Sequence, residues 1–155
     1  MDDFAYMRLA MKLADQAAAL GEIPVGALVV EDATGKILGQ GFNRRETDHD
    51  PTAHAEVLAI RRAAQHLNHW RLNGCTLYVT LEPCPMCAGA ISQARIDRLV
   101  YGAADPGQGC AGSVYRIPED PAFNHFCTSD GGALADECRA ELDAFFIQCR
   151  MHNQK

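Results

Sequence analysis

The chain has 155 residues, a net charge of −6 and an apolar fraction of 48%, values typical of one ordinary folded domain spanning residues 1–155. Its start is acidic and its most apolar run, residues 25–30, is far too short to cross a bilayer. We therefore expect no signal peptide and no membrane span, and we expect a cytoplasmic protein. The acidic balance also argues against a broadly basic surface for nucleic acid, although a local basic patch remains compatible with it.

The first 43 residues predict a helix followed by two paired strands. An apolar residue recurs every three or four positions, which predicts an amphipathic helix with the buried stripe Phe4, Met7, Met11, Ala14 and Ala18. Asp2 or Asp3 is expected to cap this helix, and Gly21 to end it. Residues 25–30 predict a buried strand, and residues 37–43 an antiparallel partner that follows a turn.

The middle of the chain predicts a helix, a strand, a short helix and another strand. Asp50 and Pro51 are expected to open the first of these helices, as its cap and its first residue. Its predicted buried stripe is Val57, Ile60, Ala64 and Leu67. Residues 76–81 predict a strand, residues 85–92 a short helix, and residues 98–101 a further strand. Strands that flank a helix favour a parallel crossover.

The last third predicts a long loop and a final helix. Residues 102–132 are rich in Gly, Pro and Asp and predict loop, with one short strand around residues 125–127. The final helix carries the apolar stripe Leu134, Cys138, Leu142, Phe145 and Cys149, so we expect Cys138 and Cys149 to pack in the core. The pattern as a whole predicts an α/β fold, with a mixed sheet of about five strands and helices packed on it.

Two short motifs supply the side chains of a metal site. His54 offers an imidazole, and Cys84 and Cys87 offer thiolates at a Cys-x-x-Cys spacing. Three protein ligands leave a fourth position for water, which distinguishes a catalytic zinc from a structural one. Either motif alone would have an ordinary explanation other than catalysis, because Cys-x-x-Cys also occurs in structural zinc knuckles and redox pairs. Both together, each at a predicted helix start, predict a catalytic Zn²⁺, one per subunit. The other five cysteines show no disulfide framework and are expected to be reduced thiols.

Glu56 is the predicted catalytic residue. It lies two positions after His54, and in a regular helix two such side chains point roughly 200° apart. Both can face one metal only at the irregular start of a helix, where the sequence places them. Glu56 would move protons between a zinc-activated water, a ring nitrogen and the leaving ammonia. His-x-Glu followed by Pro-Cys-x-x-Cys is the signature of zinc-dependent nucleobase deaminases.

The residues around these motifs resemble the bacterial tRNA adenosine deaminases. The resemblance is carried by residues 50–56 and 79–90 and continues through residues 101–106, 110–113, 123–125 and 134–138, nearly the whole chain. It implies a three-layer cytidine-deaminase-like fold with helices on both faces of the sheet. It also implies a homodimer that converts adenosine to inosine at the wobble position of a tRNA anticodon stem-loop.

The resemblance further implies the substrate contacts. Asn43 would hydrogen-bond the flipped adenine, Val25 and Leu81 would line the pocket wall, and Asp105 would contact the neighbouring ribose. Asn43 could instead end a strand, and Asp105 with Pro106 is ordinary turn chemistry. Family members often carry a lysine shortly after this aspartate and an arginine cluster at the C-terminus. This chain has Gly107 and Gln108 in the loop and keeps only Arg150 in residues 145–150.

Two other functions use the same residues. The zinc motif also occurs in deaminases that act on a free nucleobase or nucleoside, of the guanine or cytosine type, and residues 50–56 resemble guanine deaminases too. A catalytically dead, zinc-stabilised RNA-binding protein would keep the metal site as well. The intact Glu56 argues against that last alternative, because a purely structural zinc needs no free carboxylate.

Overall fold

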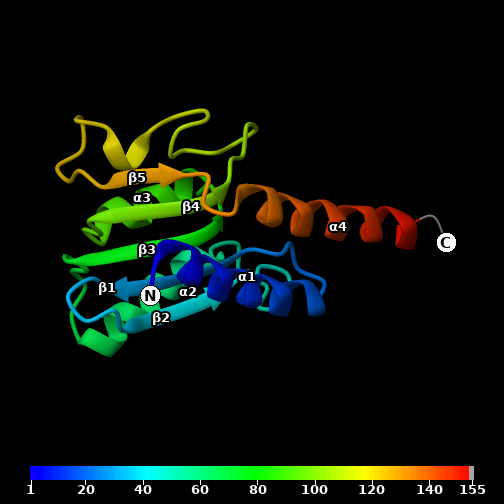
Figure 1. Cartoon of the computed structure of the whole chain (residues 1–155), viewed down its shortest axis with the longest axis horizontal. Helices are drawn as coiled ribbons and strands as arrows, with labels where there is room; N and C mark the ends of the chain where they lie inside the picture. The colour runs from blue at the N-terminus through cyan, green and yellow to red at the C-terminus, as the bar shows by residue number, and fades with distance from the viewer. Residues whose placement is uncertain (154–155) are drawn as a thin grey trace.

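A five-stranded mixed sheet runs through the centre of the computed structural model, which describes residues 1–153 (Figure 1). The strands lie in the order β2-β1-β3-β4-β5. β1 is antiparallel to both of its neighbours, whereas β3, β4 and β5 are parallel to one another. Their bounds are β1 (Gly26–Glu31), β2 (Ile37–Phe42), β3 (Cys75–Leu81), β4 (Arg98–Ala103) and β5 (Thr128–Gly131).

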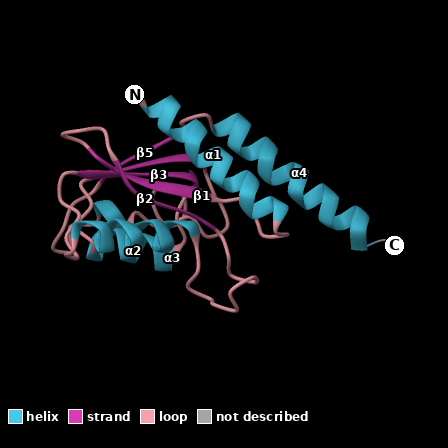
Figure 2. Ribbon diagram, turned by 90° about the horizontal axis from the view of Figure 1, so that it is seen from below, coloured by secondary structure: helices cyan, strands magenta, loops and turns pink. Residues whose placement is uncertain are grey.

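Helices cover both faces of the sheet. Figure 2 shows α1 (Asp3–Ala19) and α4 (Ala135–Asn153) on one face, and α2 (Ala55–Leu67) and α3 (Pro85–Gln93) on the other. A single turn of 3₁₀ helix, η1 (Ile117–Glu119), lies in the long connection before β5. The predicted α/β fold with a mixed sheet and helices on both faces is therefore confirmed.

The direction of the strands fixes where the loops meet. β2, β3 and β4 all run the same way, so their C-terminal ends lie at one edge of the sheet, where β1 begins. Asn43, Glu82 and Asp105 follow closely on these three strand ends. Residues far apart in the sequence are brought together at this edge, which is the usual place for a site in an α/β sheet.

Small residues let α2 lie unusually close to β2. The backbone of α2 at Ala59 and Ala63 lies directly above Gly39 and leaves no space for a Cβ at that glycine. The predicted buried stripe of this helix was therefore wrong: its members, Val57, Ile60, Ala64 and Leu67, are only partly buried. The positions that face the sheet are instead Ala55, Leu58, Ala59 and Ala63. Mostly small side chains occupy the buried face because α2 lies so close to β2. The periodicity of the larger apolar residues therefore pointed to the neighbouring positions on the helix, which are only partly buried.

The first helix shows a similar displacement. Asp2 caps α1, as predicted, by accepting a hydrogen bond from the Ala5 amide at 2.8 Å. Phe4, a predicted core residue, is 51% exposed, and Met11 and Ala18 are only partly buried. The helix buries the face made of Tyr6, Met7, Ala10, Leu13, Ala14 and Ala17.

Two boundaries and the burial of one cysteine also differ from the prediction. α2 begins at Ala55 and not at Pro51, because Asp50 forms a local turn in which its carboxylate accepts hydrogen bonds from the Thr52 amide and hydroxyl. The last strand lies at Thr128–Gly131, just after residues 125–127. Cys138 packs in the core as predicted, but Cys149 does not, because α4 extends beyond the sheet (Figure 1).

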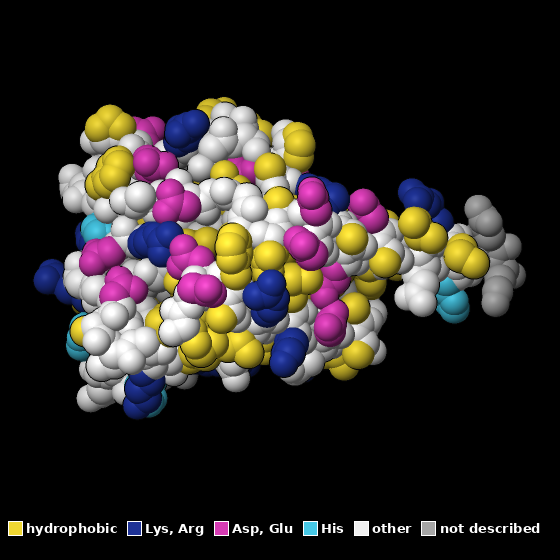
Figure 3. Space-filling model, in the orientation of Figure 1, with side chains coloured by type: hydrophobic (Ala, Val, Ile, Leu, Met, Phe, Trp, Pro, Cys, Tyr) yellow, Lys and Arg dark blue, Asp and Glu magenta, His cyan; other side chains and the backbone are white. Residues whose placement is uncertain are grey.

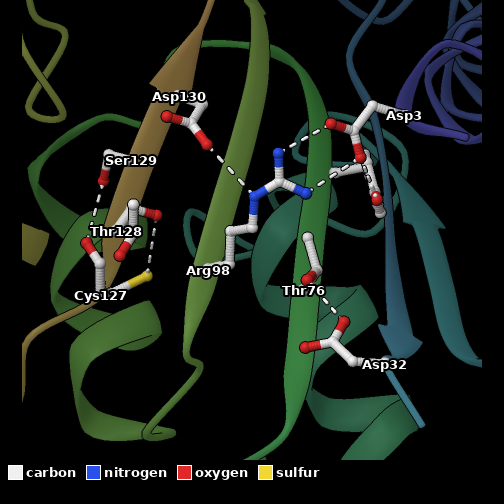
Figure 4. Close-up of polar contacts among 9 residues, drawn as sticks. Asp3, Asp32, Thr76, Arg98, Cys127, Thr128, Ser129 and Asp130 are labelled. Atoms are coloured by element: carbon white, nitrogen blue, oxygen red, sulfur yellow. Dashed lines mark hydrogen bonds and ion pairs between the residues drawn. The ribbon is translucent and has the colours of Figure 1, made fainter.

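Polar contacts join α1 to the far strands of the sheet. Figure 4 shows the Arg98 guanidinium between Asp3 and Asp130, with Nη2 of Arg98 2.7 Å from the Asp3 carboxylate and Nε 3.2 Å from that of Asp130. Tyr78 donates a further hydrogen bond to Asp3 at 2.7 Å. These contacts tie the start of α1 to β3, β4 and β5.

The outer part of α4 carries apolar side chains on its surface (Figure 3). Phe146, Ile147 and Met151 are all exposed there. Across the described part of the chain, none of the helices combines the length and the apolar character that crossing a bilayer requires.

Candidate metal centre and substrate pocket

Three metal-binding side chains meet where two helices begin. His54 is the N-cap of α2, Cys84 is the N-cap of α3, and Cys87 lies in the first turn of α3. His54 Nδ1 lies 3.5 Å from Cys84 Sγ and 3.4 Å from Cys87 Sγ. The three ligand atoms all lie within 4.8 Å of one another. The structure thus brings together the three residues that the sequence proposed as ligands.

The spacing of these atoms suits a zinc ion. Tetrahedral zinc binds sulfur at about 2.3 Å and imidazole nitrogen at about 2.0–2.1 Å, which separates a nitrogen ligand from a sulfur ligand by roughly 3.5 Å. The two distances from His54 Nδ1 agree with that separation. Two thiolates and one imidazole are soft and borderline donors of the kind that zinc prefers. The cluster is therefore compatible with a zinc site.

The local electrostatics favour a thiolate at the start of α3. A helix N-terminus carries a partial positive charge that stabilises an anion, and Cys84 occupies the N-cap. Its pKa is lowered to about 4, chiefly because the Cys87 thiol donates a hydrogen bond to it and secondarily because of His54. The same hydrogen bond raises the pKa of Cys87. One cysteine is thus ready to bind a cation at neutral pH.

Glu56 lies beside the cluster as the second residue of α2. It is only 4% exposed, and this burial raises the pKa of its carboxyl group to about 7. A carboxyl group with such a pKa can both accept and release a proton near neutral pH. His54 reaches the cluster because its backbone is extended, with φ −81° and ψ 152°, and helical geometry begins only at the next residue. The irregular helix start expected for His54 and Glu56 is therefore present, although four residues later than Asp50 and Pro51 suggested.

A pocket opens above these residues at the edge of the sheet where β2, β3 and β4 end. It encloses about 540 Å³ of empty space, a figure that includes the open solvent at its mouth. His54, Glu56 and Cys84 form part of its lining. The four residues proposed from the resemblance as substrate contacts all line it as well: Val25, Asn43, Leu81 and Asp105.

Asn43 and Asp105 also hold the backbone around the pocket. The Asn43 side chain donates to the carbonyl of Ile23 at 3.3 Å and accepts from the amide of Arg45 at 3.2 Å. The Asp105 carboxylate accepts from the Gly107 amide at 3.1 Å. Both residues thus have the structural roles that the sequence allowed. The second hydrogen of Asn43 Nδ2 and the Oδ2 atom of Asp105 take no part in these bonds and could contact a substrate.

Sequence reasoning missed four residues of the pocket wall. Ile23, Arg45, Glu82 and Gln108 line the pocket. Glu82 had a signal, since it stands two positions before the first cysteine ligand and directly after a strand. Arg45 and Ile23 had none, because their place depends on the path of loops that no short motif specifies.

Comparison with known proteins identifies the family. The family model of the MafB19-like deaminases matches residues 1–117. The tRNA-specific adenosine deaminase of Haemophilus influenzae is 51% identical over 148 residues, which cover 96% of this chain and 85% of that protein. That of Bacillus subtilis is 45% identical over 148 residues, covering 96% of this chain and 91% of its own length. The chain belongs to the tRNA-specific adenosine deaminase family.

The solved structures that are similar to this adenosine deaminase family member include two kinds of enzyme. A structure from a study of A-to-I editing by tRNA:A34 deaminases at the wobble position of transfer RNA has a TM-score of 0.84 and 42% identity, covering 88% of this chain and 98% of that one. A guanine deaminase from Nitrosomonas europaea has a TM-score of 0.80 and 26% identity, covering 92% of this chain and 83% of that one. The fold is thus shared by enzymes with different substrates.

Proposed function

We propose that this protein is a hydrolase that deaminates adenosine to inosine at the wobble position of a tRNA anticodon. The observation that carries this proposal is the near-full-length similarity, at 51% and 45% identity, to two tRNA-specific adenosine deaminases. The metal cluster alone would serve a guanine deaminase equally well. Because tRNA is the proposed substrate, we also propose that the enzyme works in the cytoplasm.

His54, Cys84 and Cys87 would hold one zinc ion per subunit. Their donor atoms have the spacing that tetrahedral zinc needs, and three ligands leave one position for water. When bound, zinc would lower the pKa of a coordinated water from about 15.7 to about 7 and so make it a nucleophile at neutral pH.

Glu56 would carry the protons of the reaction. Its carboxylate would accept a proton from the attacking water and deliver it to the ring nitrogen next to the reacting carbon of adenine. A second transfer would place a proton on the amino group, which leaves as ammonia. The water oxygen stays on the base as the carbonyl of hypoxanthine, so the net reaction is hydrolysis. The burial that raises the pKa of Glu56 supports this role.

The remaining pocket residues would bind the flipped base. We propose that Asn43 hydrogen-bonds the adenine, that Val25 and Leu81 contact its faces, and that Asp105 contacts the neighbouring ribose. All four line the pocket that contains His54 and Glu56, which supports their assignment. An enzyme that acts on a base in RNA must take that base out of its stack, and a concave pocket with apolar walls suits that step.

We also propose that the enzyme is a homodimer. In α3 the side chains of Ala88 and Ile91 pack into the core of their own chain, whereas Gly89 and Ala90 remain partly exposed. These two small residues would allow close approach of a second copy. Sedimentation that finds an active monomer at micromolar concentration would remove this part of the proposal.

The function is tested with a synthetic anticodon stem-loop that carries adenosine at the wobble position, because sequence-specific enzymes read RNA in its single-stranded loops. Zinc-loaded protein should convert that adenosine to inosine, read by mass spectrometry, and should leave free guanine and cytosine unchanged. Glu56→Ala should abolish turnover and keep its zinc. Deamination of free guanine alone would favour the guanine deaminase alternative. Stoichiometric zinc without turnover on any of these substrates would favour the catalytically dead RNA-binding protein.

A further inference from the structure

A buried carboxylate holds the segment on one side of the pocket. Glu22 is 2% exposed, and one of its oxygens accepts the amide of Glu46 at 3.2 Å. Its other oxygen accepts both the amide and the hydroxyl of Thr47, each at 2.6 Å. The 43–47 segment that Glu22 holds in this way brings Asn43 and Arg45 into the pocket wall.

A second buried carboxylate holds the segment on the other side. Glu82 is also 2% exposed, and one of its oxygens accepts the Asp105 amide at 3.0 Å and the Ser113 hydroxyl. Its other oxygen accepts the amides of Ala111 at 3.1 Å and Ser113 at 2.9 Å. The backbone at Gly109 lies so close to this carboxylate that a Cβ there would have no space. The 105–113 segment brings Asp105 and Gln108 into the pocket wall.

The two segments lie on opposite sides of the pocket. Asn43 follows β2 and Asp105 follows β4, and the pair β1 and β3 lies between these strands in the sheet. Both segments leave the same edge, because β2 and β4 run in the same direction. The distance between the segments therefore sets the width of the pocket mouth.

Hydrogen bonds from these segments are the main partners of both carboxylates. Among the ion pairs formed by residues 1–153, none includes Glu22 or Glu82. Burial alone would raise the pKa of Glu22, but the hydrogen bonds from Thr47 and from the Glu46 amide outweigh it, and this pKa is lowered. Burying a charge costs free energy unless the charge is well hydrogen-bonded. Each carboxylate is therefore stable in its buried position only while its segment keeps the conformation that supplies these hydrogen bonds.

We propose that Glu22 and Glu82 are positioning residues that hold the 43–47 and 105–113 segments on the two sides of the pocket and thereby set how tightly the pocket binds its substrate. The inference rests on the proposed function only for the choice of substrate, the anticodon stem-loop. Neither residue is assigned a part in the chemical step, which belongs to Glu56 and the metal ligands.

Glutamine is the sharpest substitution for both positions, because it keeps the shape and removes one acceptor oxygen. In Glu82→Gln the amide NH₂ must face the Asp105 amide or the pair of Ala111 and Ser113 amides, so at least one backbone donor loses its acceptor. In Glu22→Gln either the Glu46 amide or the Thr47 amide loses its acceptor in the same way. Asp97→Asn is the matched control. Its carboxylate accepts the Gly74 amide at 2.8 Å, at the edge of the sheet where β3 and β4 begin and away from the pocket.

Three measurements on the zinc-loaded proteins test the inference. Amide hydrogen exchange should rise within the 43–47 segment in Glu22→Gln and within the 105–113 segment in Glu82→Gln. KM for the stem-loop should rise about tenfold in each, with kcat changed by less than about threefold and with unchanged zinc content. Asp97→Asn removes the same charge away from the pocket and should leave both KM and the exchange of the two segments unchanged.

Exchange that stays unchanged in both segments would overturn the inference, and so would a loss of kcat that follows a loss of zinc. An equal rise of KM in Asp97→Asn would show that KM responds to the loss of a carboxylate charge away from the pocket, and this also overturns the inference. If the wild-type protein leaves the stem-loop unchanged, the proposed function fails, while the exchange data still decide whether the two carboxylates hold their segments.

Discussion

A single methyl group at position 41 should move the catalytic helix. Gly41 lies in β2 beneath the start of α2, and a Cβ there would lie 2.8 Å from Leu58 Cβ and 3.0 Å from the carbonyl oxygen of Ala55. Ordinary contacts begin at 3.4 Å, so the helix must withdraw by about 0.6 Å. Ala55 stands between His54 and Glu56, which means that this displacement reaches both the metal ligand and the proton carrier.

The size of the effect follows from two opposing contributions. Overpacking of a core typically costs about 1–3 kcal/mol. Replacing glycine by alanine also stabilises the fold by about 0.4–1 kcal/mol, because alanine lowers the conformational entropy of the unfolded chain. We therefore expect Gly41→Ala to lower the free energy of unfolding by about 1–2 kcal/mol, which is a fall in Tm of roughly 2–8 °C for a chain of this size. A misplacement of about 1 Å at an active site can cost about 100-fold, so we expect kcat/KM to fall roughly tenfold.

Denaturant unfolding, zinc content and kcat/KM are measured on the same preparation, well below the Tm. Gly89→Ala is the control for stability, because it adds the same methyl group inside α3, where a Cβ would meet nothing of its own chain within 4 Å. Gly89 also lies on the proposed dimer face, so sedimentation of this variant is measured as well. It should stabilise the chain by about 0.5–1 kcal/mol. Wild-type stability together with wild-type activity in Gly41→Ala would refute the argument that the glycines of β2 set the position of α2.

Four further substitutions test other parts of the molecule. His54→Ala should lose most of its zinc, because it removes one of only three protein ligands, and metal analysis by mass spectrometry checks this. Gly107→Lys should tighten stem-loop binding and steepen the slope of the logarithm of the binding constant against log salt by about 0.7, with little change in the single-turnover rate at saturating RNA. Asn43→Ala should slow the chemical step more than it weakens binding. Asp3 has a lowered pKa, chiefly through its hydrogen bond with Arg98, so its contribution to stability is present above its ordinary value of 3.8 and is lost as pH falls through and below that value. Asp3→Asn should therefore reduce the loss of Tm on acidification, by an amount worth at most about 1 kcal/mol because the pair is partly exposed to solvent.

The sequence predicted the elements that short-range patterns encode. β1 to β4 and the starts of α1 and α3 lie close to their predicted positions, because buried strands are short apolar runs and because Asp2 and Pro85 are strong helix-start signals. The ligand cluster was predictable for the same reason, since its spacing is contained in two short motifs. Its assembly at one point follows because β2 and β3 run in the same direction, so that α2 and α3 both begin at the same edge of the sheet.

The errors arose where long-range packing decides. Nothing local in α2 indicates that Gly39 and Gly41 lie beneath it, so the larger Val57 and Ile60 looked like the buried face. Phe4 was misplaced because it lies one position outside the narrow contact between α1 and the sheet. The anchoring of the pocket segments was missed as well, since Glu22 and Glu46 are far apart in the sequence and meet only in the folded chain.

Substrate choice in this fold must depend on the segments around the pocket more than on the metal centre. The solved structures similar to this chain include a guanine deaminase and one from a study of tRNA:A34 deaminases, so the fold alone does not decide the substrate. The floor of the pocket, made by the starts of α2 and α3, carries the candidate metal ligands His54 and Cys84 together with Glu56. The 43–47 and 105–113 segments form two walls of the pocket and contribute the polar and charged side chains Asn43, Arg45, Asp105 and Gln108. A conformation held by buried carboxylates lets such segments vary their exposed side chains without disturbing the ligands beneath them.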